Sequence, residues 1–528
     1  MDSNSHWTAR REAALAGVML AGLLVPAALY AGYDLGSLEL VLLSTISILM
    51  GLVVAPVART RAGAGILTLV TLGLFTELYL LGSLAGSPVG KTLAILSVGA
   101  IGGLAFWRPR IGLGVAAAAL LSQIGTAIVL RPSKHMLVER PVAARTAPSV
   151  VHIVLDEHGS IDALPDPTVS AGERHELARS WERLGFTLFN RAYTAEAATH
   201  LTIARLWNPR RLDPDSAVQR GDGPEAFIIK EHDQAAEITA KRVLDITGMS
   251  YVSLRPIIAT RVPVTRLFQQ DYPRATAGIA AARLPVVERL KIMLARIMDW
   301  IVRSARSQAA KALGEATGLL HRDGGLFYSW RSAYGLTGKH ALDALGDRLS
   351  CCGTRGTYYY AHVLLPHWPY VFKSDCSVRP VSEWLYNEVH ELDRTNTLAT
   401  RAERYRLYLD QARCTQRVIA RLVASIDRNP ALADATIMVH GDHGARISLK
   451  PSERMGISEA EYSDATFELD RRATLFALRR PGHPPQAEHR PVRIDALVQA
   501  LRDSDFVSYD AALAADQKSS PFTAKAAR

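Results

Sequence analysis

The first quarter of the chain is almost continuously apolar. From residue 13 to residue 130 nearly every window consists of Leu, Val, Ala, Ile and Gly, whereas charged and apolar residues alternate beyond residue 131. A helix needs about 20 apolar residues to cross the hydrocarbon core of a bilayer. The pattern therefore predicts a helical transmembrane domain over residues 1–130. Its five or so spans are expected at residues 13–33, 38–57, 64–85, 92–107 and 111–130.

Charged residues in the short connections predict how these spans are oriented. Arginine pairs stand at positions 10–11, 59–61 and 108–110, whereas Asp34 and Glu39 follow the first span. Because cytoplasmic loops carry an excess of Lys and Arg, the amino terminus is expected in the cytoplasm. Five crossings would place the remainder on the extracytoplasmic side of the inner membrane, provided that the short fourth run spans.

The pattern changes to that of an α/β domain after a linker at residues 131–148. Short apolar runs at residues 150–155, 358–365 and 435–439, the first of them mostly β-branched, are typical of buried parallel strands, and helical patterns lie between them. Polar residues follow each run directly. In open α/β sheets ligands bind beyond the carboxyl ends of the strands, so these polar residues are expected to converge. We predict a catalytic α/β domain with a largely parallel central sheet over residues 149–514.

Two further segments have a distinct pattern. Residues 284–306 have an apolar helical face and, on another face, an arginine at every seventh position. This pattern is typical of a helix lying on an anionic membrane, and a surface helix packed on its own domain is the alternative. Residues 515–528 are polar and rich in Ala and Lys, which is typical of a disordered tail.

The net charge of +10 indicates an anionic partner. No nucleic-acid-binding motif is present, so membrane lipid head groups are the expected partners and nucleic acid is not. All four cysteines lie beyond residue 350. They are either buried free thiols or disulfides in an oxidising compartment, where a bridge between Cys376 and Cys414 is the preferred pairing.

Asp156, Asp442 and His443 are the sharpest candidates for chemistry. Asp156 follows the first β-branched run, and the other two lie in the Gly-Asp-His-Gly element after the last run. Each alone could be a turn former or a helix cap. Together, carboxylate and imidazole ligands suit Zn²⁺ or Mn²⁺, with Mg²⁺ or Ca²⁺ as alternatives. Gly441 and Gly444 are expected to permit the tight turn that directs Asp442 and His443 to one point.

These two elements resemble a known family. The early strand-Asp-Glu and the late strand-Gly-Asp-His-Gly look like the metal-binding ends of the sulfatase-like fold within the alkaline phosphatase superfamily, over residues 149–511. About five spans followed by an outer catalytic domain is similar to lipoteichoic acid synthases and phosphoethanolamine transferases. The resemblance implies an enzyme that takes a phosphorylated head group from a lipid and carries it on a threonine.

The resemblance puts the nucleophile six residues after Tyr193, at Thr199, with Thr202 as the fallback. The Cys or Ser followed by Pro and Arg that sulfatases need for formylglycine is absent, which favours a threonine acting directly. A divalent cation lowers the pKa of a bound hydroxyl, so Thr199 is expected both as nucleophile and as ligand. Alternatively, Thr199 is a helix N-cap, and a helix N-terminus itself favours a bound phosphate.

His367 resembles the histidine of the family's His-x-Pro element, which contacts the transferred group or protonates the leaving oxygen. A packed histidine in a Pro-rich turn is the alternative. Glu157, His158 and Arg446 are candidates for a second metal or a phosphate contact. The chain departs from the transferases because no histidine follows Asp-His-Gly before His483, which argues against a second zinc.

The combined prediction is a membrane-anchored, metal-dependent phosphotransferase or hydrolase. It would act on phosphate or sulfate esters of cell-envelope lipids or glycans through Thr199. The rival hypothesis is a catalytically degenerate relative that binds envelope components or partner proteins through the same site.

Overall fold

The chain divides into two compact units, which are described separately. One comprises residues 1–135 and 274–333, and the other comprises residues 136–273 and 334–528. The computed structural model describes residues 14–19, 21, 24–26, 28–29, 33, 36–58, 60–75, 88–129, 148–165, 168–197, 199–207, 266–269, 275–304, 334–380, 383–384, 398–447, 464–514 and 520–522.

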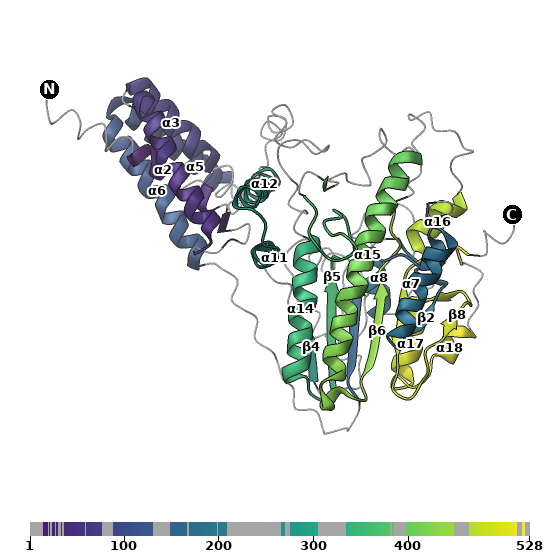
Figure 1. Ribbon diagram of the computed structural model, residues 1–528. Coiled ribbons are helices and arrows are strands. Elements are labelled where there is room, and N and C mark those ends of the chain that lie inside the picture. Colours follow the sequence, from purple (N-terminus) through teal and green to yellow (C-terminus); the bar gives the residue numbers. More distant parts are fainter. Residues whose placement is uncertain are drawn as a thin grey trace. The chain divides into compact units, whose positions relative to one another are not determined.

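The second unit is an α/β domain built on a seven-stranded sheet with the order β4-β5-β1-β6-β7-β2-β8 (Figure 1). Its strands are β1 Val150–Leu155, β2 Thr187–Phe189, β4 Arg266–Gln269, β5 Thr357–Val363, β6 Thr436–Gly441, β7 Phe476–Arg479 and β8 Ala487–Glu488; β3 Ala192–Tyr193 and β9 Val492–Arg493 pair separately. Its helices are α7 Ala171–Arg183, α8 Thr199–Trp207, α14 Tyr334–Cys352, α15 Leu398–Asp427, α16 Asp464–Arg472, α17 Ile494–Asp503 and α18 Asp510–Leu513, with short 3-10 turns at Ile161–Ala163 and Pro430–Leu432.

Strand β1 lies inside the sheet, between β5 and β6, and every one of its residues is buried. It pairs in parallel with β5 on one side and with β6 on the other, so that Leu155 is level with Val363 and with Gly441. Helices α8 and α17 pack their apolar residues against one face of these strands. Helices α14 and α15 lie side by side in front of the sheet in Figure 1. The carboxyl ends of β1, β5 and β6 therefore open at one edge.

The sheet is largely parallel, as expected for its core, but it is mixed because one strand is reversed. Strand β7 runs antiparallel to both β6 and β2. The chain leaves β6 at the edge where β1 also ends and re-enters the sheet there, because the Leu475 N–H donates to His158 O at 2.8 Å and the Gly441 N–H donates to Leu475 O at 3.0 Å. A strand that starts where its neighbour stops must run the opposite way.

The first unit is helical. It contains α2 Leu38–Ala58, α3 Arg61–Phe75, α5 Pro88–Trp107, α6 Pro109–Val129, α11 Ala275–Ala281 and α12 Val286–Ser304. One of its cores joins Leu72 of α3 to Leu113, Ala117 and Leu120 of α6.

The prediction of about five membrane spans over residues 1–130 is wrong. Within the described ranges, no helix combines the length and the apolar character that a crossing requires. Helix α3, for example, is described over 15 residues, or roughly 22 Å at about 1.5 Å per residue, whereas a hydrocarbon core is about 30 Å thick.

The amphipathic segment at residues 284–306 contributes helix α12 to the helical unit. Its Met293 and Ile297 are buried against Leu40 and Leu43 of α2. Arg289 Nε lies 2.7 Å from Glu39 Oε1, so the polar edge of the helix is also paired. Of the two alternatives that the sequence left open, these contacts favour a helix packed on its own domain.

The four cysteines form two disulfides, and no cysteine is free. The expected bridge between Cys376 and Cys414 is present and ties the segment after β5 to the middle of α15. The second bridge joins the neighbouring Cys351 and Cys352, at the exposed end of α14. Most of the predicted linker at 131–148 lies outside the described residues. In the predicted tail, Phe522 is buried against Tyr193.

Replacing Cys376 and Cys414 by serine should lower the free energy of unfolding by about 2–4 kcal/mol, because a loop closed across 38 residues restricts the unfolded chain. Urea unfolding without reductant measures the change. The matched control is the serine pair at Cys351 and Cys352, which closes almost no loop and should shift the midpoint little. Equal effects of the two double variants would contradict this account.

Candidate metal and nucleophile site

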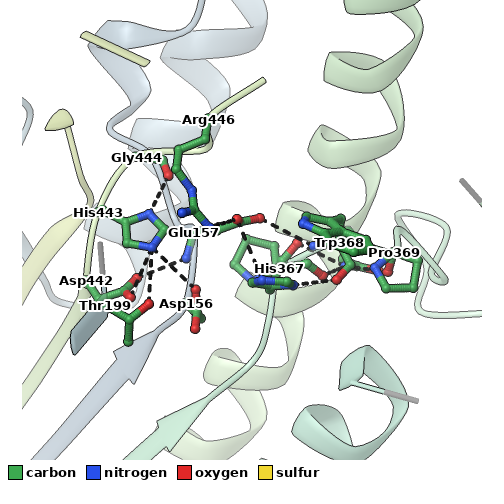
Figure 2. Close-up of polar contacts among 12 residues, drawn as sticks. Asp156, Glu157, Thr199, His367, Trp368, Pro369, Asp442, His443, Gly444 and Arg446 are labelled. Carbon is green, nitrogen blue, oxygen red and sulfur yellow. Dashed lines mark hydrogen bonds and ion pairs between the residues drawn. The ribbon is translucent and has the colours of Figure 1, made fainter. Parts of the chain in front are cut away.

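Side chains from three strand ends and one helix start meet at the open edge of the sheet (Figure 2). Asp156 follows β1, and Asp442 and His443 follow β6. His362 lies one residue before the end of β5 and is level with Val154. Because side chains alternate between the faces of a strand, His362 shares a face with Asp156. Thr199 is the first residue of α8.

The distances join these residues into one cluster. His443 Nε2 lies 3.2 Å from Thr199 Oγ1, 3.3 Å from Asp442 Oδ2 and 3.7 Å from Asp156 Oδ1. On the other side of Asp156, His362 Nε2 lies 3.7 Å from Oδ2. All but the half-buried Thr199 are fully withdrawn from solvent. The four residues that the sequence nominated as metal ligands, Asp156, Thr199, Asp442 and His443, are thus brought together.

The donor atoms of this cluster fit a divalent cation. One ligand atom each from Asp156, His362 and Asp442 lies within 4.8 Å of the others, a spacing that one ion can bridge. Asp156 Oδ1 and Asp442 Oδ2 are buried and accept no hydrogen bond from the described residues. Buried carboxylate oxygens left in this way are costly unless a cation or donor meets them. Two carboxylates with imidazoles are a ligand set for Zn²⁺ or Mn²⁺.

A second group adjoins the first and shares Asp156 with it. It consists of Asp156, Glu157 and His367, again with ligand atoms within 4.8 Å of one another. His367 Nε2 lies 3.7 Å from Glu157 Oε1, and the Trp368 N–H donates to Glu157 Oε2 at 3.4 Å. Arg446 forms an ion pair with Glu157 through Nη2 (Figure 2). His367 therefore stands beside the metal cluster, on the side of Glu157.

Neighbouring positive charge keeps the buried acids ionised. Burial alone would raise the pKa of Glu157, but His367 and Arg446 hold that pKa below its ordinary value. Burial acts in the same direction on Asp442, and His443 with His362 lowers its pKa overall. Burial would lower the pKa of Arg446, yet Glu157 raises it above its ordinary value. The two carboxylates and the guanidinium are therefore charged at neutral pH.

Two residues of the site adopt a left-handed backbone, Glu157 with φ 63° and Arg446 with φ 55°. Such angles are uncommon for residues other than glycine and cost free energy. At Glu157 the geometry turns the chain so that its N–H donates to Asp442 Oδ1 at 3.0 Å, while its carboxylate meets Arg446. The strained turns thus bring the two strand ends onto each other.

The glycines of the Gly-Asp-His-Gly element are needed for close packing rather than for a positive φ. A Cβ at Gly444 would stand 2.0 Å from Asp470 O, and one at Gly441 would stand 2.4 Å from His158 O. Neither glycine is among those with positive φ. The sequence led us to expect that these glycines permit a tight turn. The structure shows instead that they are required because neighbouring backbone atoms leave no room for a side chain.

A chain of buried side chains runs behind the cluster. His440 Nδ1 donates to Gly441 O at 2.8 Å, since a carbonyl can only accept. The Nε2 atom of a neutral His440 then accepts from His152 Nε2 at 2.6 Å, and His152 Nδ1 accepts from the Tyr358 hydroxyl at 2.6 Å. Burial, the largest cause, lowers the pKa of His440 to about 4 and that of His152 well below its ordinary value, so both rings are neutral.

The other nominated residues lie apart from the cluster. His158 is turned toward Trp181, with Nδ1 at 3.1 Å from Gly159 O, and burial lowers its pKa to about 4. Thr202 is buried within α8, and its hydroxyl has no hydrogen-bond partner among the described residues. The sequence reading missed His362, because a histidine inside an apolar strand looks like a core residue. The register of β5 against β1 reveals it.

No family model matches the sequence, and no curated protein matches it. Among solved structures, the chain is similar to the C-terminal periplasmic domain of EcEptC from Escherichia coli, at 13% identity, covering 72% of this chain and 88% of that one with a TM-score of 0.33. The phosphonate monoester hydrolase SpPMH from Silicibacter pomeroyi gives 13% identity, 68% and 73% coverage and a TM-score of 0.35. A 2-O GAG sulfatase gives 12% identity, 69% and 71% coverage and a TM-score of 0.32. Likenesses this low say nothing of the reaction, which must be judged from the site.

We call the Gly-Asp-His-Gly turn at residues 441–444 the ligand turn. Replacing Gly444 by alanine should lower the free energy of unfolding by about 1–3 kcal/mol, because the added methyl forces Asp470 and the ligand turn apart. Urea unfolding measures it. Gly172, in α7, is the control, since a Cβ there meets nothing within 4 Å and alanine should be neutral or stabilising by up to about 1 kcal/mol. A Gly444→Ala protein as stable as the parent would show that the turn yields without cost.

Proposed function

We propose that the α/β unit is a metal-dependent phosphotransferase or hydrolase that attacks phosphate or sulfate esters through Thr199. The observation that carries the proposal is the position of the Thr199 hydroxyl, 3.2 Å from His443 Nε2 at the edge of a buried carboxylate and imidazole cluster. A threonine placed only as a helix cap would not need two ionised carboxylates and an imidazole around it. Hydrolase and transferase share the first step, attack by Thr199 and loss of the leaving group.

The tautomer of His443 follows from its hydrogen bonds. Its Nδ1 lies 2.9 Å from Gly444 O, and a carbonyl can only accept, so Nδ1 carries the proton. The lone pair of a neutral His443 is therefore on Nε2, which faces Thr199. Asp156, His362, Asp442, His443 and Thr199 would hold a divalent cation, which lowers the pKa of a bound hydroxyl and stabilises charge on the phosphoryl or sulfuryl oxygens.

The residues of the chain supply the other requirements of the reaction. Thr199 opens a helix, whose amino-terminal N–H groups favour an anionic group beside the hydroxyl. His367 donates Nδ1–H to Trp368 O, which leaves Nε2 free to carry a proton toward a leaving oxygen. Glu157, 3.7 Å from that Nε2, stabilises the protonated ring. His367 is therefore proposed as the general acid.

The substrate class and the compartment are also part of the proposal. A cluster with a half-buried nucleophile suits a small esterified head group, and phosphate or sulfate esters of envelope lipids or glycans carry such groups. The two disulfides support an extracytoplasmic, oxidising compartment, since bridges persist there and are rare in the cytosol.

Replacing Thr199 by alanine should reduce turnover of p-nitrophenyl phosphate or p-nitrophenyl sulfate by at least about 10³-fold, because the nucleophile is lost, while metal stays bound. Hydrolysis rates and elemental analysis of the same preparation measure both. Thr202→Val is the matched control and should keep the parent rate and metal content.

Mass spectrometry of the Thr199 peptide after a rapid acid quench should reveal a phosphorylated or sulfated threonine in the parent protein. A Thr199→Ala protein with the parent rate would remove Thr199 from the mechanism. A parent protein that binds no divalent ion after supplementation would favour the rival reading, a degenerate binding protein.

A further inference from the structure

The second group of possible ligands already contains a positive charge. Asp156, Glu157 and His367 have the spacing of a metal site, but Arg446 forms an ion pair with Glu157 at that same place. Figure 2 shows the Arg446 side chain passing beside His443 and ending at the Glu157 carboxylate. A divalent cation that used Glu157 would have to displace this guanidinium.

Arg446 is held in that position by more than the ion pair. Its backbone is left-handed, with φ 55°, and its N–H donates to Asp470 O at 3.1 Å. Its side chain is 16% exposed, while that of Glu157 is 1% exposed. A buried carboxylate that loses its guanidinium partner is left with an uncompensated charge, which is strongly unfavourable. The fold therefore fixes the arginine at Glu157 instead of leaving it in solvent.

The formal charges favour one ion over two. Three carboxylates, those of Asp156, Glu157 and Asp442, surround the two groups and are buried. With neutral imidazoles, one guanidinium and one divalent cation neutralise them, and a proton on His367 would only add positive charge. A second divalent cation beside Arg446 would leave a net positive charge in a buried site, where unbalanced charge is costly.

Arg446 also retains a donor for a ligand. Its Nε is buried and has no hydrogen-bond partner among the described residues. At the edge of the ligand cluster, such a donor is available to a group that arrives with a ligand. An oxygen of a phosphate or sulfate ester has the chemistry to accept from it.

We propose that Arg446 is a built-in cation that takes the place of a second metal ion. The site then binds a single divalent cation, at Asp156, His362 and Asp442, and removing the charge of Arg446 opens a second site at Asp156, Glu157 and His367. This inference rests on the proposed function for its first ion and adds the number of ions and the role of Arg446.

The test is the number of zinc ions bound by the full-length protein, measured by equilibrium dialysis against Zn²⁺ and elemental analysis. We expect one ion per chain for the parent and for Arg446→Lys, which keeps a positive charge. Arg446→Met, similar in size but uncharged, should bind two. The double variant Glu157→Gln with Arg446→Met should return to one, because it lacks the carboxylate of the second site.

The outcomes separate this inference from the proposed function. One ion in both the parent and a folded Arg446→Met protein would overturn the inference and leave the proposed function intact. Two ions in the parent would overturn it without any variant, and one ion at saturating zinc would support it even if Arg446→Met fails to fold. A parent that binds no ion would overturn both.

Discussion

Three buried carboxylates at the carboxyl ends of parallel strands are the constraint around which the site is arranged. Withdrawing Asp156, Glu157 and Asp442 from water costs free energy that only nearby positive charge or hydrogen-bond donors can offset. Each compensating group comes from a different part of the chain. The Glu157 N–H meets Asp442, and Arg446 meets Glu157. The site is assembled only when β1, β5 and β6 are in register.

That requirement explains local features that would otherwise be unfavourable. Of the six described residues other than glycine with left-handed backbone angles, two belong to the site, and these are the ion pair of Glu157 and Arg446. The free energy of these angles is offset because the resulting turns make the pair possible in a buried setting. The same closeness excludes a side chain at Gly444, where the ligand turn touches the backbone of Asp470. The strained backbone angles and the close contact at Gly444 therefore have one cause. The carboxyl ends of β1 and β6 approach each other, and the residues that follow them carry opposite charges.

Local patterns in the sequence were sufficient to nominate part of the site but not its extent. Asp156, Asp442 and His443 each follow a β-branched run, so alternation and strand ends pointed to them directly, and Thr199 came from a resemblance in spacing. His362 could not be found in this way, because its role depends on the register of β5 against β1. His158 was nominated for a second metal or a phosphate contact, but its ring lies beside Trp181 instead. The apolar amino-terminal run predicted membrane spans, but no described helix there meets the combined requirement of length and apolar character.

The buried chain of Tyr358, His152 and His440 bears on why the ligand turn has a defined shape before any ligand arrives. Its direction is set at one end by Gly441 O, which can only accept, and at the other by a tyrosine hydroxyl, which can donate. With both rings neutral, each nitrogen between these ends has a single consistent assignment as donor or acceptor. Reversing any one bond would leave two lone pairs or two hydrogens facing each other in a dry core. Gly441 O thereby accepts a hydrogen bond from His440 Nδ1, and the Gly441 N–H donates to Leu475 O at 3.0 Å. Because both polar groups of the residue before Asp442 are bonded to the core, the carboxylate and imidazole that follow start from a fixed point.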